Sequence, residues 1–193
     1  MTKVGPEMSN ACRELASHLS NPGPEHWKAL ERAVGYIKSR EGVGLKFSRP
    51  RSDQLISFVD SNYATDPDDR KSISGRINTL GGTILNWSSK KQQTVTLSST
   101  EAEYVALSEC AQETKFDRML LKEILNLNKP AKIFEDNTGT TFLVKNQQVG
   151  ARTKHIDVRH QFIRGPLQDK TLEISFIRSE NNYADIMTKN VLE

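Results

Sequence analysis

The sequence predicts an α/β domain preceded by a short helical segment. Three observations lead to this fold class: a meander of three strand-like runs, a long helical stretch after it, and two further strand-like runs separated by helices. With 193 residues and 21.8 kDa, the chain has room for one ordinary domain and a short additional segment.

Residues 1–50 are expected to form two helices. Pro6 opens the first, which runs to about Leu19, and a breaker cluster at 20–24 separates it from the second. Pro24 suits the first turn of the second helix. The apolar residues at helical spacing in that helix are Trp27, Leu30, Val34 and Ile37. Two helices alone bury too little surface to be stable, so we expect the segment to pack on the rest of the chain or on protein outside this sequence.

The predicted sheet begins after a polar linker at 48–53. The run 55–60 is strand-like, and the runs 73–80 and 83–87 flank Gly81-Gly82, which indicates a hairpin. Two further strands are expected at 133–136 and 172–178. The helices of this part are expected at 99–125, 138–145, 155–167 and 183–189.

Composition excludes several classes of protein. Charged residues make up 26% of the chain and the net charge is only +3, so charge alone does not indicate nucleic-acid binding. No apolar run approaches the roughly 18 residues of a membrane helix, and the N-terminus lacks the apolar core of a secretory signal. Cys12 and Cys110 form neither a disulfide framework nor a zinc spacing. We therefore expect a protein of a reducing compartment with no membrane partner.

Four acidic side chains stand where chemistry could use them. Asp60 and Asp136 end strands, whereas Glu103 and Asp185 lie in the first turns of helices. A carboxylate at a strand end projects into the crevice where α/β proteins bind ligands. Converging carboxylates repel one another unless a cation lies among them, and oxygen ligands select Mg²⁺ or Mn²⁺. Two such ions can activate a water against a phosphodiester.

Each of these acids also has an ordinary interpretation. The two strand-end aspartates could start loops by bonding their own backbone, and Asp185 could stabilise a helix N-terminus. Ser98 and Glu101 match a capping box at the start of the long helix. Thr100 and Glu103 match one as well. Because Glu103 extends the apolar face of that helix, we assign Glu101 to capping and Glu103 to chemistry.

Five motifs, in order, resemble those of the ribonuclease H domain of Ty1/copia-type retrotransposon Pol polyproteins. They are FVDSNYATDPDDRKSISG, NWSSKKQQTVTLSSTEAEYVAL, FEDNTGTTFLVKN, RTKHIDVRHQFIR and NNYADIMTK. Residues 1–50, with LSNPGPEHWKALERAVGYIK and GVGLKF, resemble the segment that ends the reverse transcriptase. We therefore expect a helical segment at 1–50 and a ribonuclease H-like domain at 53–193. No YxDD-type polymerase motif occurs, so no DNA synthesis is expected.

The resemblance implies a ribonuclease H-like fold: a five-stranded mixed sheet, its first three strands antiparallel, with helices on both faces. It implies a metal-dependent endonuclease that cleaves the RNA strand of RNA–DNA hybrids with two Mg²⁺ or Mn²⁺ ions per site. The catalytic and metal-holding residues would be Asp60, Glu103, Asp136 and Asp185. The partners would be the hybrid and the reverse transcriptase portion of the same polyprotein, in a cytoplasmic retrotransposon particle or the nucleus. The alternative is a catalytically inactive nucleic-acid-binding or scaffold remnant.

One loop departs from the pattern of many cellular ribonucleases H, which carry a mobile histidine before the final aspartate. Residues 178–182 contain no histidine, and Glu180 is a candidate to replace part of its role. His160 is expected in packing or on the surface.

Basic and polar residues flank the proposed crevice in the sequence. Phosphate contacts would position a hybrid, and donors to the 2′-hydroxyl would distinguish its RNA strand. The candidate substrate-binding residues are Asn62, Arg70, Lys71, Lys90, Lys91, Ser99, Asn137, Arg152, Lys154 and His155. Capping, turn hydrogen bonds and a solvated surface are the alternative interpretations of these residues.

Overall fold

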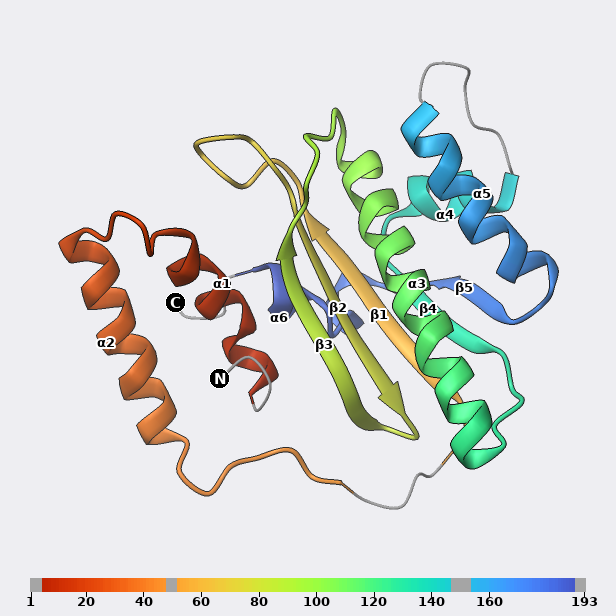
Figure 1. Ribbon diagram of the computed structural model, residues 1–193, viewed down its shortest axis with the longest axis horizontal. Coiled ribbons are helices and arrows are strands. Elements are labelled where there is room, and N and C mark those ends of the chain that lie inside the picture. Colours follow the sequence, from red (N-terminus) through yellow and green to blue (C-terminus); the bar gives the residue numbers. More distant parts are fainter. Residues whose placement is uncertain (1–4, 48–51, 147–153, 190–193) are drawn as a thin grey trace.

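A five-stranded mixed sheet forms the centre of the protein in a computed structural model, which describes residues 5–47, 52–146 and 154–189 (Figure 1). The strands are β1 (Leu55–Asn62), β2 (Ile73–Leu80), β3 (Thr83–Lys91), β4 (Ala131–Glu135) and β5 (Leu172–Phe176). Their order is β3-β2-β1-β4-β5. The first three strands are antiparallel, and β4 and β5 run parallel to β1 and to each other. This confirms the predicted fold class.

Helices cover both faces of the sheet. They are η1 (Pro6–Met8), α1 (Ser9–Ser17), α2 (Pro24–Ser39), α3 (Ser99–Leu125), α4 (Thr138–Asn146), α5 (Lys154–Gln168), η2 (Ser179–Asn181) and α6 (Asp185–Thr188). Ser57 of β1 contacts Thr114 of α3 at 2.7 Å, whereas Asp60 accepts a hydrogen bond from Thr188 of α6. Because side chains alternate along a strand, α3 and α6 lie on opposite faces. No helix in the described ranges is long and apolar enough to cross a membrane.

The hydrophobic core lies between α3 and the sheet. Val59, Leu107 and Ile133 are each 0% exposed there. A buried polar contact also joins α3 to the β2–β3 hairpin, because the side-chain amides of Asn78 and Asn86 donate to Asp117 Oδ2 at 2.6 and 2.7 Å. These contacts fix α3, and with it the N-terminal part of the helix that carries Glu103, against the sheet.

Local signals in the sequence account for several boundaries. Ser98 Oγ accepts a hydrogen bond from the backbone N–H of Glu101, and the Glu101 side chain accepts one from Leu97 N–H, which confirms the capping role of Glu101. Gly81 and Gly82 both have positive φ in the hairpin turn, as the predicted turn requires.

Other boundaries differ from the expected ones at the sheet margins. β3 continues to Lys91 because it stays paired with β2, and β4 begins earlier, at Ala131. The last strand ends at Phe176, and the last helix is shorter than predicted and is preceded by η2.

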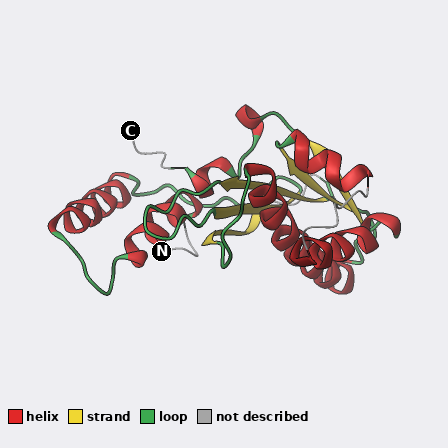
Figure 2. Cartoon of the chain, turned by 90° about the horizontal axis from the view of Figure 1, so that it is seen from above, coloured by secondary structure: helices red, strands yellow, loops and turns green. Residues whose placement is uncertain are grey.

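The N-terminal helices lie beyond the β3 edge (Figures 1 and 2). Helix α1 packs on both β3 and α6, and α2 packs on α1. The predicted apolar face of α2 is largely open: Trp27 is 63% exposed, Leu30 40% and Val34 36%. Ala33 is buried where α2 meets α1, so the N-terminal segment does pack on the rest of the described chain. The apolar face of α2 is not covered there, and its packing on protein outside this sequence stays a prediction. The division of the chain at 1–50 and 53–193 stays a prediction.

A glycine allows α6 to approach the sheet. Gly75 of β2 pairs with Asp60, and a Cβ at this position would lie 2.6 Å from Thr188 Cγ2 and 2.7 Å from Met187 Cβ. We expect Gly75→Ala to lower the free energy of unfolding by about 1–3 kcal/mol, measured by urea denaturation, because α6 must move away. The matched control is Gly35→Ala in α2, where an added Cβ meets nothing within 4 Å. Equal stability of the two variants would contradict this packing argument.

Candidate functional site

Three of the four predicted acidic residues meet at one edge of the sheet. Asp60 lies near the end of β1, and Asp136 directly follows β4, the parallel neighbour of β1. Glu103 reaches the same edge as the fifth residue of α3, just beyond the first turn in which it was expected. One carboxylate oxygen from each residue lies within 4.8 Å of the others. Asp60 is 3% exposed and Glu103 7%, so this acidic cluster is largely withdrawn from water.

The fourth predicted acid, Asp185, lies beside this cluster. It begins α6, and its charge contributes to the raised pKa of Asp60, but it is not among the three carboxylates that converge. Its Oδ2 pairs with Lys189 Nζ at 2.6 Å, and its buried Oδ1 has no hydrogen-bond partner among the described residues. Lys189 therefore holds Asp185 at the margin of the cluster.

Two residues that the sequence did not single out attach α6 to the site. The Thr188 hydroxyl donates a hydrogen bond to Asp60 Oδ2. The Asn182 side-chain amide, 4% exposed, donates to the carbonyl oxygen of Val59 at 2.8 Å, next to Asp60 in β1. Asn182 Oδ1 also accepts from Ala184 N–H at 3.1 Å, which fixes the chain just before Asp185. The NNYADIMTK motif contains both residues, but no pattern in it indicates these contacts.

The electrostatics of the cluster disfavour several negative charges at once. Burial raises the pKa of Asp60 to about 6, with the Thr188 hydrogen bond and the Lys189 charge acting in the opposite direction. Burial, together with the charges of Glu135, Asp60 and Asp136, raises the pKa of Glu103 to about 10. Closely spaced carboxylates in a poorly solvated place cannot all ionise unless a positive charge joins them.

Sequence reasoning missed a further acid, Glu135. It ends β4, is 0% exposed, and shares the α3 side of that strand with Ala131 and Ile133. Burial raises the pKa of Glu135 well above the usual range of a glutamate. The alternation of β4 could have placed Glu135 on the core face, but in the letters EDN it reads only as the neighbour of Asp136.

The residues present fit a hard divalent cation. The three close donors are all carboxylate oxygens, and Glu103 Oε2 is buried without a hydrogen-bond partner in the described parts of the chain. Oxygen donors of this kind suit Mg²⁺ or Mn²⁺. Asp60, Glu103 and Asp136 could therefore hold such an ion.

The predicted substrate-binding residues fall into different settings. The Asn62 side chain donates to the carbonyl oxygen of Thr188 at 3.3 Å, and Asn137 Oδ1 accepts from Thr140 N–H at 2.9 Å at the start of α4. The contact that Asn137 makes is thus that of a helix cap, which was the alternative interpretation of this residue. The residues Arg70, Lys90 and Ser99 are exposed. A role for any of these residues in substrate binding stays a prediction.

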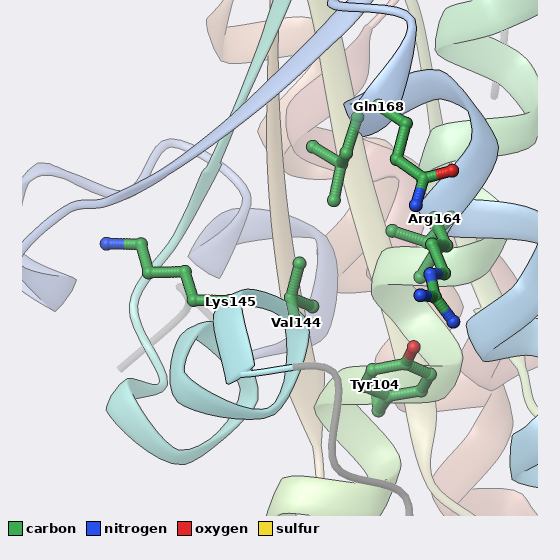
Figure 3. A pocket seen from close by; sticks show the side chains of 7 residues that line it. Tyr104, Val144, Lys145, Arg164 and Gln168 are labelled. Atoms are coloured by element: carbon green, nitrogen blue, oxygen red, sulfur yellow. The ribbon is translucent and has the colours of Figure 1, made fainter.

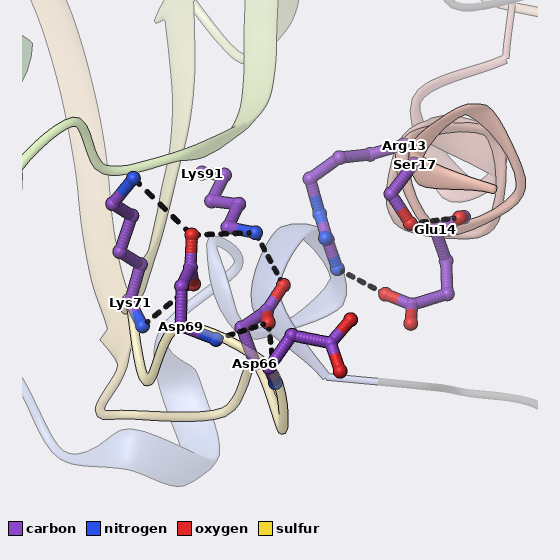
Figure 4. A network of polar contacts seen from close by, with 8 residues as sticks. Arg13, Glu14, Ser17, Asp66, Asp69, Lys71 and Lys91 are labelled. Atoms are coloured by element: carbon purple, nitrogen blue, oxygen red, sulfur yellow. Dashed lines mark hydrogen bonds and ion pairs between the residues drawn. The ribbon is translucent and has the colours of Figure 1, made fainter. Parts of the chain in front are cut away.

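Lys71, and Lys91 at the end of β3, form ion pairs with acids of the loop between β1 and β2 (Figure 4). Lys91 Nζ lies 2.5 Å from Asp66 Oδ2 and 3.1 Å from Asp69 Oδ2, and Lys71 Nζ lies 3.2 Å from Asp69 Oδ2. The loop acids thus compensate both charges, and these pairs would have to open before either lysine could bind a phosphate.

The remaining predictions fall at the limits of the described chain. Arg152 lies outside the described residues, and Lys154 and His155 begin α5, where their side chains and that of His160 are not among those described. In the loop before Asp185, the exposed Glu180 pairs with Arg178 at 3.6 Å.

A pocket of about 260 Å³ lies elsewhere, between α3, α4 and α5 (Figure 3). Tyr104, Lys145 and Arg164 are among its lining residues, and none of the predicted site residues lines it. The acidic cluster therefore remains the candidate site.

Comparison with known proteins gives clear relatives, although no protein-family model matches the chain. The chain is 36% identical over 192 residues to the Retrovirus-related Pol polyprotein from transposon TNT 1-94 of Nicotiana tabacum, and 34% identical over 185 residues to that from transposon RE2 of Arabidopsis thaliana. These matches cover 99% and 95% of this chain but 14% and 13% of the relatives, so the chain spans about one seventh of their length. It is also 42% identical over 113 residues to Secreted RxLR effector protein 161 of Plasmopara viticola, covering 58% of this chain and 80% of that protein.

Solved structures share the fold. LC11-RNase H1, isolated from compost, matches with a TM-score of 0.54 and 16% identity, over 70% of this chain and 92% of that chain. A foamy viral protease-reverse transcriptase matches with a TM-score of 0.57 and 15% identity, over 92% of this chain and 30% of that chain. The fold of this protein is therefore ribonuclease H-like.

The raised pKa of Asp60 predicts a pH-dependent stability of the metal-free protein. An ordinary aspartate ionises near pH 4, so between about pH 4 and 6 the unfolded chain loses this proton while the folded chain keeps it. The contribution of protonated Asp60 to the free energy of unfolding is therefore full below about pH 4 and is lost as the pH rises through 6. We expect Asp60→Asn to be more stable than the parent by about 1–3 kcal/mol at pH 8, and equally stable at pH 4.

Urea denaturation in EDTA from pH 4 to 8 measures this difference. Asp169→Asn, an exposed position before β5 at the far end of the sheet, is the matched control and should follow the parent at every pH. Parallel stability profiles for Asp60→Asn and the parent would show that Asp60 ionises normally.

Proposed function

Because the chain belongs to the family of retrovirus-related Pol polyproteins from copia-type transposons, we propose that it is a divalent-metal-dependent ribonuclease H that cleaves the RNA strand of RNA–DNA hybrids. The observation that carries this proposal is the convergence of Asp60, Glu103 and Asp136 at one edge of a ribonuclease H-like sheet. This activity would belong to reverse transcription, with the reverse transcriptase portion of the same polyprotein as a partner. The place of action would be a cytoplasmic transposon particle or the nucleus.

The carboxylates of the site would hold two Mg²⁺ or Mn²⁺ ions, which when bound activate a water and stabilise the leaving oxygen of a phosphodiester. Asp60, Glu103 and Asp136 supply the close oxygens, and Asp185 would join them after parting from Lys189. Thr188 orients the Asp60 carboxylate through its hydroxyl. The low exposure of Asp60 and Glu103 keeps bulk water away from these oxygens, which strengthens their interaction with a positive charge.

An RNA–DNA hybrid is the proposed substrate. LC11-RNase H1, which shares the fold with a TM-score of 0.51 and 15% identity in that form, has been solved in complex with an RNA/DNA hybrid. In this protein the exposed Arg70 and Lys90 lie at the end of the sheet where β1 finishes. Ser74 of β2 is paired with Ser61 of β1 on one side and with Lys90 of β3 on the other, and Arg70 lies in the loop that follows β1. Their charges could contact phosphates beside the acidic cluster without reading the sequence.

We expect Asp136→Asn to lower hybrid cleavage by at least about 100-fold while binding at low salt is kept, because one carboxylate is lost and the phosphate contacts remain. The assay is cleavage of a labelled RNA–DNA hybrid in Mn²⁺, with duplex RNA and duplex DNA as comparison substrates, and fluorescence anisotropy reports binding. Asp169→Asn is the control and should keep full activity. Unreduced cleavage by Asp136→Asn would remove this residue from the site, and hybrid binding without cleavage by the parent would favour the inactive remnant.

The all-oxygen donor set predicts which cations support activity. EDTA should abolish hybrid cleavage, and added Mg²⁺ or Mn²⁺ should restore it, since both ions prefer carboxylate ligands. The measurement is the initial cleavage rate after dialysis against EDTA and titration with each ion. Restoration by Zn²⁺ alone, or cleavage that persists in EDTA, would be inconsistent with this site.

A further inference from the structure

Glu135 is the most completely buried acid of the described chain. It is 0% exposed and occupies the core face of β4, two residues beyond Ile133 and opposite α3. A glutamate is almost never fully buried unless a partner compensates its charge. An ionised Glu135 would therefore need a positively charged or hydrogen-bonding partner at this position.

The described protein supplies only part of that compensation. Glu135 Oε1 accepts a hydrogen bond from the backbone N–H of Asn137 at 2.9 Å. Glu135 Oε2 and Glu103 Oε2 are both buried, and neither has a hydrogen-bond partner among the described residues. Among the side chains that the structure describes, no lysine or arginine forms an ion pair with either glutamate.

Glu135 and Glu103 lie close enough for their charges to interact. Among neighbouring charges, that of Glu135 contributes most to the raised pKa of Glu103. Glu135 is nevertheless outside the group of oxygens within 4.8 Å, which contains Asp60, Glu103 and Asp136. Glu135 is therefore a fully buried neighbour of the acidic cluster, directly before Asp136 in the chain, and not one of the three close donors.

We propose that Glu135 is a fifth acidic residue of the divalent-cation centre, a positioning residue beside the acidic cluster whose negative charge is compensated by the cation that the three close carboxylates hold. The inference rests on the proposed function for the presence of that cation. Glu103 within the all-oxygen cluster and Glu135 beside it each have a buried oxygen without a partner among the described residues, and a divalent cation is the charge that suits them. Glu135 would then raise the affinity for the cation without touching the substrate.

The test replaces Glu135 by glutamine in the full chain. Glu135→Gln keeps the size of the side chain and an oxygen that can accept from Asn137 N–H, but it removes the charge. We expect isothermal titration calorimetry at pH 7.5 to give a Kd for Mn²⁺ weakened by about 10-fold or more, as for other residues that support metal ligands. In EDTA the same variant should melt at the parent temperature or above it, because without the cation no compensated charge is lost from the core.

Glu123→Gln is the matched control, since Glu123 lies on the exposed part of α3 and should leave both measurements unchanged. An unchanged Kd for Mn²⁺ in a folded Glu135→Gln protein would overturn the inference and identify Glu135 as a neutral core acid. If Glu135→Gln does not fold, Glu135→Met is the second variant, because it removes the charge together with most of the hydrogen-bonding demand of the side chain. The Kd for Mn²⁺ and the melting temperature in EDTA then test the inference in the same way.

Calorimetry separates this inference from the proposed function. Weaker Mn²⁺ binding by Glu135→Gln supports the inference even if the parent cleaves no hybrid, which would count against the nuclease activity alone. Cleavage by the parent with equal Mn²⁺ affinity in parent and variant would overturn the inference alone. A parent that binds no Mn²⁺ would overturn both.

Discussion

The uncompensated burial of carboxylates at one end of the sheet is the constraint on which the rest of the structure depends. The parallel pairing of β1 and β4 brings Asp60 and Asp136 to the same edge, and the N-terminal part of α3 adds Glu103. Repulsion within this group opposes folding, so the surrounding contacts must hold it together. The apolar core between α3 and the sheet supplies most of that stabilisation, because its side chains are fully buried beneath the cluster.

A second set of contacts holds the short helix α6 at the same edge. Four residues give a helix too little internal hydrogen bonding to be stable alone. Its position therefore depends on Thr188, which bonds Asp60, on Asn182, which bonds the β1 backbone, and on the absence of a side chain at Gly75. The same contacts that place Asp185 beside the site thus also fasten α6 to the sheet.

Much of this architecture could be predicted from the sequence, since α3, the β2–β3 hairpin and the strand-end aspartates carry local signals. The choice of Glu103 over Glu101 depended on the apolar stripe of α3, and the contacts of Glu101 agree with it. The ion pairs of Lys71 and Lys91 could not be predicted, because they depend on how the loop between β1 and β2 folds back. For α2 the sequence left two packing surfaces open, the rest of the chain or protein outside it, because periodicity indicates an apolar face but not what covers it.

Glu135 shows how a motif can conceal a neighbour that matters. In the letters EDN attention goes to the aspartate, but successive residues of a strand point to opposite faces, so Asp136 can face the open edge only if the residue before it faces the core. An alanine or valine there would stabilise the core by simple burial. A glutamate at this position instead places an ionisable group where burial opposes its negative charge. If a cation occupied the adjoining cluster, as proposed, the ionised form would be tolerated, and cation binding would be coupled to the stability of the core through β4.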